Sequence, residues 1–383
     1  MKFKSIKLTI FLTSFAFGIF VSECFGQNKK NNFANITDNK IIYETPAVYE
    51  LMNIAFALAD TNNYSGNLNI YYNVIDTSNS YYKEVVDYFS PYKNHKLIKE
   101  LNKHLDKSLM RYLYNLQKGY NSRSVDNNIK RNIHFPFFRR LLYGFNSVSR
   151  NTIEDFAKTS NFKKFHDNHL PFYQEILIDT KNKLNLNKVQ QWLETEFPSK
   201  YDKFNIVISP LMNATHFTTN FYFKGDKTSI MWVTTGLGYD NKVYSQTQIA
   251  GIYTGVVFTE IDHNYVNAVS DKYKSEINTT MGNTNREKWI KSDGDGKFYG
   301  SGYKIFNEYM THAVYLIYTS TFYSKNDQIV IENSRIKMME QRRKYHKFGD
   351  FYRKLNTLYL AKNGEETITK LYPKMLEWCK QQN

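Results

Sequence analysis

Two pairs of residues that could do acid–base or metal chemistry lie on separate segments of the chain. Glu260 and His263 stand three residues apart in "VVFTEIDHNY", and Glu308 and His312 stand four apart in "NEYMTH". These spacings place both members of a pair on one face of a helix. Imidazoles and carboxylates are metal ligands, and a carboxylate can also serve as a general base. The two pairs therefore predict a metallohydrolase-type site built from two helices.

Apolar residues around both pairs predict that these polar side chains face the protein interior. The first stripe is Ile249, Ile252, Val256, Glu260 and His263, and the second is Ile305, Glu308 or Tyr309, His312 and Leu316. A buried, unpaired carboxylate costs several kcal/mol or shifts its pKa, and a cation offsets that cost. Either pair alone is typical of an ordinary hydrogen bond in a core. Both together favour a metal site, with His263, Glu308 and His312 as ligands and Glu260 as base.

Three apolar segments ahead of the first pair predict strands that would position it. They are "FNIVISPL" from Phe204, "HFTTNFYF" from His216 and "TSIMWVTTG" from Thr228. The last two alternate between apolar and polar residues, which is typical of strands with one face buried. Long helices are expected over about 246–267 and 303–318, followed by a helical tail.

The chain ahead of these strands is expected to be mostly helical. Helical stripes are predicted over 46–59, 81–89, 97–116 and 152–197, a short strand over 68–75, and a frayed segment over 27–44. The predicted fold class is therefore α+β, with a mostly helical amino-terminal half, a small sheet, an active-site helix and a glutamate helix. The expected regions are 27–200 and 201–383, which are compatible with one globular unit.

Residues 1–26 are predicted to be a signal peptide. Three lysines precede an apolar stretch, and the small residue Gly26 lies at the expected cleavage position. The stretch is short for a spanning helix of about 20 residues, so cleavage is favoured over an uncleaved anchor. A lipoprotein acylated at Cys24 is a third alternative, although Glu23 suits it badly. The protein is expected to be secreted, periplasmic or in the cell envelope, without a transmembrane segment after cleavage.

Charge and cysteine content limit what the exported chain can be. Cleavage removes three lysines and one glutamate, so the formal charge falls from +15 to +13. It also leaves Cys379 as the one cysteine, which excludes an internal disulfide. The densest basic run, "RIKMMEQRRKYHK" from Arg335, could meet phosphates or anionic lipid, but it is interpreted as a solvated helix face with Ile336, Met339 and Arg343 turned inward. No nucleic-acid motif accompanies it, so no nucleic-acid partner is expected.

The arrangement of the two pairs resembles a gluzincin-type metallopeptidase. In that family a His-Glu-x-x-His helix supplies two zinc ligands and the base, and a later helix that often begins Asn-Glu supplies a carboxylate. "TEIDH" aligns with the first helix, and Asn307-Glu308 aligns with the second, 45 residues beyond His263. The resemblance implies zinc as cofactor, a peptide or protein as substrate, and Ile230–Thr235 as the edge strand that pairs with substrate.

The chain more closely resembles a family of secreted bacterial proteins that carry the domain of unknown function 4932. The matching segments span about residues 41–320 and include "TPAVYELMNIAFAL", "FAKTSNFKKFHDNH", "FNIVISPLMNATHFTTNF", "FTEIDHNYVNAVSDKY" and "NEYMTHAV". Several relatives in that family have a full His-Glu-x-x-His at the "TEIDH" position. The resemblance therefore implies a zincin-like fold.

Thr259 is the departure from this pattern, because it stands where the first histidine ligand belongs and a hydroxyl is a poor zinc ligand. Three outcomes are open. His312 could complete a site with His263 and Glu308, or Glu260 could become a ligand and favour a harder metal. Alternatively, the site holds no metal. His216, in a predicted strand, is a further candidate whose orientation the sequence leaves open.

Two functions from different classes follow from these residues. The first is a secreted, zincin-like, metal-dependent hydrolase of peptides, in which Glu260 deprotonates a metal-activated water. The second is a degenerate, metal-free relative that works as an envelope binding or interaction protein, and Thr259 favours it. A lysine-rich surface that adheres to anionic polysaccharide or lipid is a weaker third interpretation.

Overall fold

A computed structural model describes residues 34–59, 75–105, 148–213, 216–223, 226–235, 241–293, 299–364 and 366–383. The chain divides into two compact units, 1–31 and 32–383, and every described residue belongs to the second. The predicted signal peptide with Cys24 lies outside the described residues. So do most of the predicted strand 68–75 and the end of the predicted helix 97–116.

One five-stranded sheet forms the centre of the described fold. Its strands are β1 (Ala34–Asp38), β2 (Ile41–Thr45), β3 (Lys203–Ile208), β4 (Phe217–Phe223) and β5 (Asp226–Val233). They lie in the order β1-β2-β3-β5-β4, and the pairs β2–β3 and β3–β5 are parallel, whereas both outer pairs are antiparallel. The three strands predicted from Phe204 onward are confirmed. The sheet crosses the predicted boundary at residue 200, because β1 and β2 come from the earlier region.

Strands β1 and β2 correct the prediction of a frayed segment over 27–44 for its described part, residues 34–44. They form a hairpin whose turn holds Asn39 at φ 53°, a left-handed conformation that asparagine tolerates better than most residues. Ile41 and Tyr43 are buried, and β2 pairs with β3 about 160 residues further along the chain. The Asn- and Lys-rich composition did not predict this hairpin, because its residues are buried by β3, which is distant in the sequence.

Helices before β3 form the predicted helical region. They are α1 (Ala47–Leu58), α3 (Ser80–Phe89), α4 (Lys96–Leu105), α7 (Arg150–Thr159), α8 (Phe162–Leu184) and α9 (Leu186–Glu196). Strand β2 ends at Thr45, and Pro46 is the N-cap of α1. The α+β class is confirmed.

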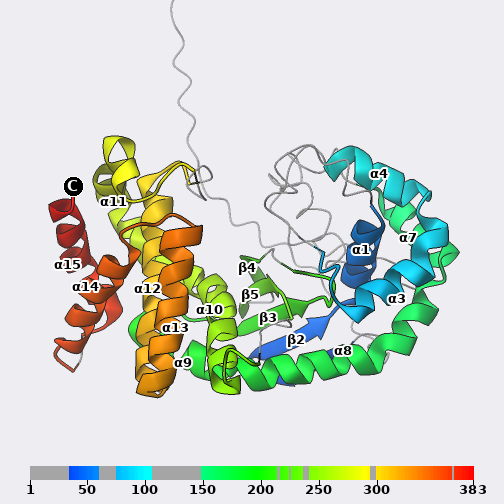
Figure 1. The fold of residues 1–383 in the computed structure, drawn as a ribbon, viewed down its shortest axis with the longest axis horizontal. Helices are drawn as coiled ribbons and strands as arrows, with labels where there is room; N and C mark the ends of the chain where they lie inside the picture. Colours follow the sequence, from blue (N-terminus) through cyan, green and yellow to red (C-terminus); the bar gives the residue numbers. More distant parts are fainter. Residues whose placement is uncertain are drawn as a thin grey trace, which may run out of the picture. The chain divides into compact units, whose positions relative to one another are not determined.

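Helices after β5 surround the two residue pairs. They are α10 (Gln246–Ser270), α11 (Lys274–Met281), α12 (Gly302–Phe322), α13 (Lys325–Lys337), the π-helical turn η7 (Met338–Arg342), α14 (Phe348–Leu360) and α15 (Ile368–Gln381). Figure 1 shows α10, α12 and α13 beside one another, with α14 and α15 beyond α12. The predicted long helices and helical tail are confirmed. None of the helices in the described ranges is long and apolar enough to cross a membrane.

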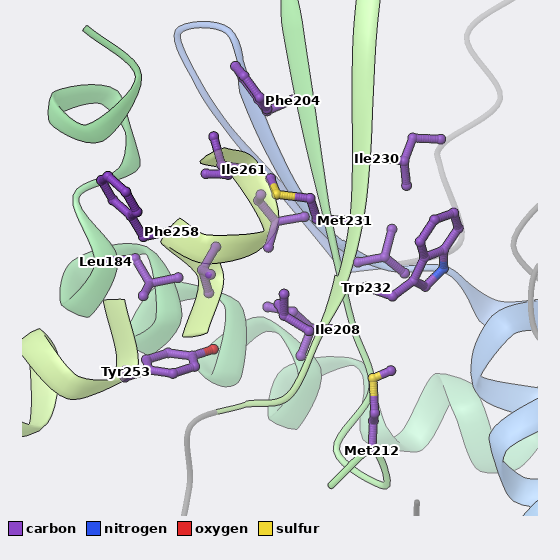
Figure 2. Packing of buried hydrophobic residues seen from close by; sticks show 14 of the residues in the cluster. Leu184, Phe204, Ile208, Met212, Ile230, Met231, Trp232, Tyr253, Phe258 and Ile261 are labelled. Carbon is purple, nitrogen blue, oxygen red and sulfur yellow. The ribbon is translucent and has the colours of Figure 1, made fainter. Parts of the chain in front are cut away.

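The sheet packs its two faces differently. Met231 of β5 points toward Phe258 and Ile261 of α10, whereas Ile230 and Trp232 point to the opposite side of the strands (Figure 2). This alternation follows from the period of two along a strand. Helix α8 also packs against β1, β2 and α10. The sheet therefore supports α10 from one side and fixes its orientation.

Helix α12 packs on α10 in the antiparallel direction. The Tyr315 hydroxyl donates to the Gly251 carbonyl at 2.7 Å, and the Tyr303 hydroxyl donates to Asp271 at 2.8 Å near the other end of the pair. Gly255 permits this close approach, because a Cβ there would overlap the Tyr315 ring and the Arg335 guanidinium. The contact brings the middle of both helices together.

Candidate functional site

Glu260 and His263 lie on the stripe of helix α10 that is most accessible to solvent. The helix begins at a capping box of Ser245 and Gln248, and Ile249 is buried as predicted. The remaining stripe members are only partly buried, namely Ile252, Val256, Glu260 and His263, and Asn267 continues the stripe. The stripe is therefore buried only in part beyond its first residue, with Ile252 and Val256 packed against the edge of the core. Neighbouring elements bury the rest of the helix, so the apolar pattern did not single out one inward face.

The two predicted pairs meet between α10 and α12. His263 Nε2 lies 3.3 Å from Glu308 Oε1, and Glu308 Oε2 lies 3.7 Å from His312 Nε2. Thr311 Oγ1 lies 3.5 Å from His263 Nδ1 on the other side of that ring. Glu308 and His312 are buried, whereas the His263 side chain is 22% exposed. The structure thus brings three of the four predicted site residues into direct contact.

Two arginines from the basic run complete this cluster. Arg343 Nη2 donates to Glu308 Oε2 at 2.9 Å, and its Nη1 lies 2.6 Å from His312 Nε2. Arg335 Nη1 lies 3.1 Å from His312 Nδ1, and its guanidinium stacks over the Tyr315 ring. Arg343 turns inward as predicted, but Arg335 is buried and does not belong to a solvated face.

The charges of Glu308 and His263 stabilise each other. Burial alone would raise the pKa of Glu308, but the Arg343 charge and the hydrogen bond from His263 hold it well below its ordinary value. Burial lowers the pKa of His263, yet the hydrogen bond and charge of Glu308 raise it to about 9. At neutral pH the pair is therefore an imidazolium and a carboxylate.

His312 and Glu260 are shifted in the opposite sense. Burial lowers the pKa of His312 to about 3, and the nearby arginines act in the same direction, so this imidazole is neutral. Burial raises the pKa of Glu260 to about 7, with the Glu308 charge adding to the effect and His263 opposing it. A carboxyl that titrates near neutral pH is suited to moving a proton.

Thr259 does not enter the cluster. Its hydroxyl donates to the carbonyl oxygens of Gly255 and Val256 in its own helix, at 3.0 and 3.1 Å. This local bond is a common alternative for a threonine inside a helix. The position that would supply the first imidazole of a His-Glu-x-x-His motif therefore contributes no atom to the site.

The cluster offers few free ligand atoms to a metal ion. Within the described residues, no group of three or more His, Cys, Asp or Glu side chains could hold a metal ion. A guanidinium already contacts Glu308 Oε2 and His312 Nε2, which are two of the three predicted ligand groups. These atoms therefore do not fit a metal in this arrangement. Zinc binding stays a prediction that metal content can test.

Asp262 is a buried residue that sequence reasoning missed. It is fully buried, and both of its carboxylate oxygens lack a hydrogen-bond partner in the structure. Burial raises its pKa well above the ordinary value, which favours the neutral form of the side chain. Its place between Glu260 and His263 in the sequence gave no signal, because the helix is apolar around most of its circumference.

His216, the further candidate histidine, makes no described contact with the cluster. His216 precedes β4, its Nδ1 is buried without a hydrogen-bond partner, and burial lowers its pKa to about 4. Among the described contacts, none joins His216 to Glu260 or His263. It is therefore not part of the site in this structure.

Comparison of this chain with protein families, with curated proteins and with solved structures found no match. The resemblance to gluzincins and to the family with domain of unknown function 4932 therefore stays an expectation from the sequence motifs.

Proposed function

We propose that this chain is an exported, metal-independent binding protein of zincin-like layout that takes an extended peptide or protein segment as ligand. The conformation of Thr259 is the main observation that supports a function without metal catalysis. The Thr259 hydroxyl donates to carbonyls of its own helix and does not reach the cluster. The segment "TEIDH" therefore supplies one imidazole, that of His263, beside Glu308. A hydrolase of this type needs more imidazole ligands than that.

The position of β4 supports a peptide ligand. Among the described strands only β5 pairs with β4, so the other side of β4 is an edge. This corrects the expectation that Ile230–Thr235 supplies the edge, because that segment belongs mostly to β5 and lies inside the sheet. An edge strand can accept an extended chain through its backbone groups.

Helix α10 is held directly beside that edge strand. The Asn220 side chain of β4 donates to Asn264 Oδ1 at 2.6 Å, and Asn264 in turn donates to Ser229 of β5 at 2.9 Å. His263, a member of the partly exposed stripe of α10, is the chain neighbour of Asn264. We infer that a segment bound along β4 reaches the partly exposed stripe of α10.

The test combines binding, cleavage and metal content. Fluorescein-labelled casein, an unfolded polypeptide, should bind the full exported chain without being cleaved, and elemental mass spectrometry should find no stoichiometric metal. Val256→Arg should weaken binding by about tenfold or more, because a charge is placed on the stripe. Ala268→Arg, on an exposed part of the same helix, is the matched control. Cleavage of casein by a metal-loaded wild-type protein would overturn the proposal.

A second candidate, the metal-dependent hydrolase, is favoured by one observation. The raised pKa of Glu260, about 7, suits a general base at neutral pH. A bound metal would polarise a carbonyl and activate water, with His263, Glu308 and His312 as the residues to hold it. Their contacts with Arg343 oppose this arrangement. Thr259→His supplies the missing imidazole, and metal uptake in that variant alone would support degeneracy of the natural site.

A further inference from the structure

The guanidinium of Arg343 occupies the space between the two residues of α12 that were predicted to bind metal. It contacts Glu308 Oε2 at 2.9 Å through Nη2 and His312 Nε2 at 2.6 Å through Nη1. These two acceptor atoms lie 3.7 Å apart. Ligand atoms bound to one tetrahedral zinc at about 2.0–2.1 Å lie at a similar separation, roughly 3.3 Å. The acceptors are thus spaced for a shared cation, and the cation present is an arginine.

We propose that Arg343 is a built-in cation that takes the place of a metal ion at this site, so that Glu308 and His312 hold a guanidinium and exclude metal. This inference deepens the proposed metal-independent function and rests on it. Arg343 lies outside both the motif around Glu260 and the pair on α12, so neither of them predicts this role.

The backbone fixes Arg343 in this position. It follows the π-helical turn η7, and its N–H donates to the Met338 carbonyl at 3.0 Å. Lys344 then adopts φ 68° and the Tyr345 N–H returns to the Met339 carbonyl at 2.9 Å, which ends the helix. Single π-turns are frequent at functional sites because they change the direction of one side chain. The turn here directs Arg343 toward α12.

Other residues contact the Arg343 side chain where it faces away from Glu308 and His312. Arg343 Nη2 donates to the Tyr299 hydroxyl at 3.0 Å, and the guanidinium lies 5.2 Å from the centroid of the Tyr345 ring. Met339 is buried beside it, with Sδ 3.6 Å from Nη1. A guanidinium held on several sides is preorganised, so little freedom is lost when it contacts its acceptors. This is a built contact and not a surface ion pair.

His312 is withdrawn from metal binding on both ring nitrogens. Arg343 faces Nε2 and Arg335 faces Nδ1 at 3.1 Å. A neutral imidazole has one acceptor nitrogen, and a metal would need it. A divalent cation placed here would also lie within a few ångströms of two guanidinium groups, which repel it strongly in a buried site. Removal of the Arg343 guanidinium would free Glu308 Oε2 and His312 Nε2, and it would also remove one of the two charges that repel a divalent cation.

The experiment measures binding of zinc ions alone by isothermal titration calorimetry with the full exported chain. The variants are Arg343→Met and, as a second version that retains polarity, Arg343→Gln. The matched control is Arg342→Met, because Arg342 is the preceding residue and is exposed. The wild type and the control should bind zinc weakly. At least one Arg343 variant, shown by circular dichroism to be folded, should bind zinc more tightly than the wild type by about tenfold or more.

A His263→Ala change in the Arg343→Met background identifies the site. It should abolish the gained affinity, because His263 and His312 are the two imidazoles beside Glu308 and the zinc would lose one of them. If folded Arg343 variants bind zinc no better than the control, the role of Arg343 is wrong while the metal-independent function still stands. If the wild type already holds zinc in a His263-dependent manner, both proposals are overturned.

Discussion

The imidazole of His263 and the carboxylate of Glu308 face each other across α10 and α12, with Nε2 and Oε1 3.3 Å apart. Glu308 is buried and is also bound by Arg343, so its charge is balanced from two sides. A buried carboxylate with two cationic partners is stabilised, whereas the loss of one partner leaves part of its desolvation uncompensated. The contact therefore links the stability of the helix pair to the charge of one histidine.

Replacement of His263 by Gln should change how stability depends on pH. The pKa of His263 is raised to about 9, so its contribution is complete below about pH 6.5 and is lost as the pH rises through 9. The stability advantage of the wild type over His263→Gln should shrink by roughly 2–3 kcal/mol between pH 6 and pH 10. Urea unfolding at both pH values measures it, with Ala268→Gln as control. A pH-independent difference would contradict the assigned pairing.

Replacement of Glu260 by Gln should show a pH dependence of the same direction but in a lower pH range. A carboxyl whose pKa is raised to about 7 makes the fold less stable as the pH rises from about 4.5 through 7. Glu260→Gln lacks this loss and should be more stable than the wild type at pH 8, by about 2 kcal/mol. Glu377→Gln, whose side chain is 61% exposed, should change little. Lower stability of Glu260→Gln at pH 8 would show that ionised Glu260 is stabilised by its neighbours.

Gly255→Ala should destabilise the contact between α10 and its neighbours. The added methyl would overlap the Arg335 guanidinium and the Tyr315 ring, both of which are held in place. Overpacking of this kind costs roughly 1–3 kcal/mol. Gly364→Ala is the control, because nothing lies within 4 Å of its added Cβ. Thermal melting of both variants compares them, and equal melting temperatures would mean that the helices separate easily.

Glu196→Ala should weaken the attachment of the carboxy-terminal helices. The Glu196 carboxylate accepts hydrogen bonds from the Tyr359 hydroxyl at 2.8 Å and the Ile368 N–H at 2.9 Å, and it contacts Lys362 at 3.2 Å. Loss of a buried acceptor with several donors costs about 2–4 kcal/mol. Glu377→Ala should cost less than about 0.5 kcal/mol. Similar denaturant midpoints for the two variants would contradict this role.

The sequence predicted the helices around the site with little error. The helix predicted over 246–267 ends at Ser270, and the helix predicted over 303–318 ends at Phe322. Strong helical periodicity and a good N-cap determine such elements locally. The hairpin of β1 and β2 was missed because its burial depends on β3, which is distant in sequence. The edge strand was assigned to the wrong segment because strand order is not a local property.

By itself the sequence determined the residue types of the site and the spacing that places Glu308 and His312 on one helix face. It also showed that Thr259 stands where an imidazole is expected. Only the tertiary structure decided that Arg343 lies between Glu308 and His312, and that Glu260 and His263 occupy the accessible stripe of α10. The physical reason is that periodicity fixes neighbours within one helix, whereas the partner of a buried charge comes from whichever distant segment packs against it.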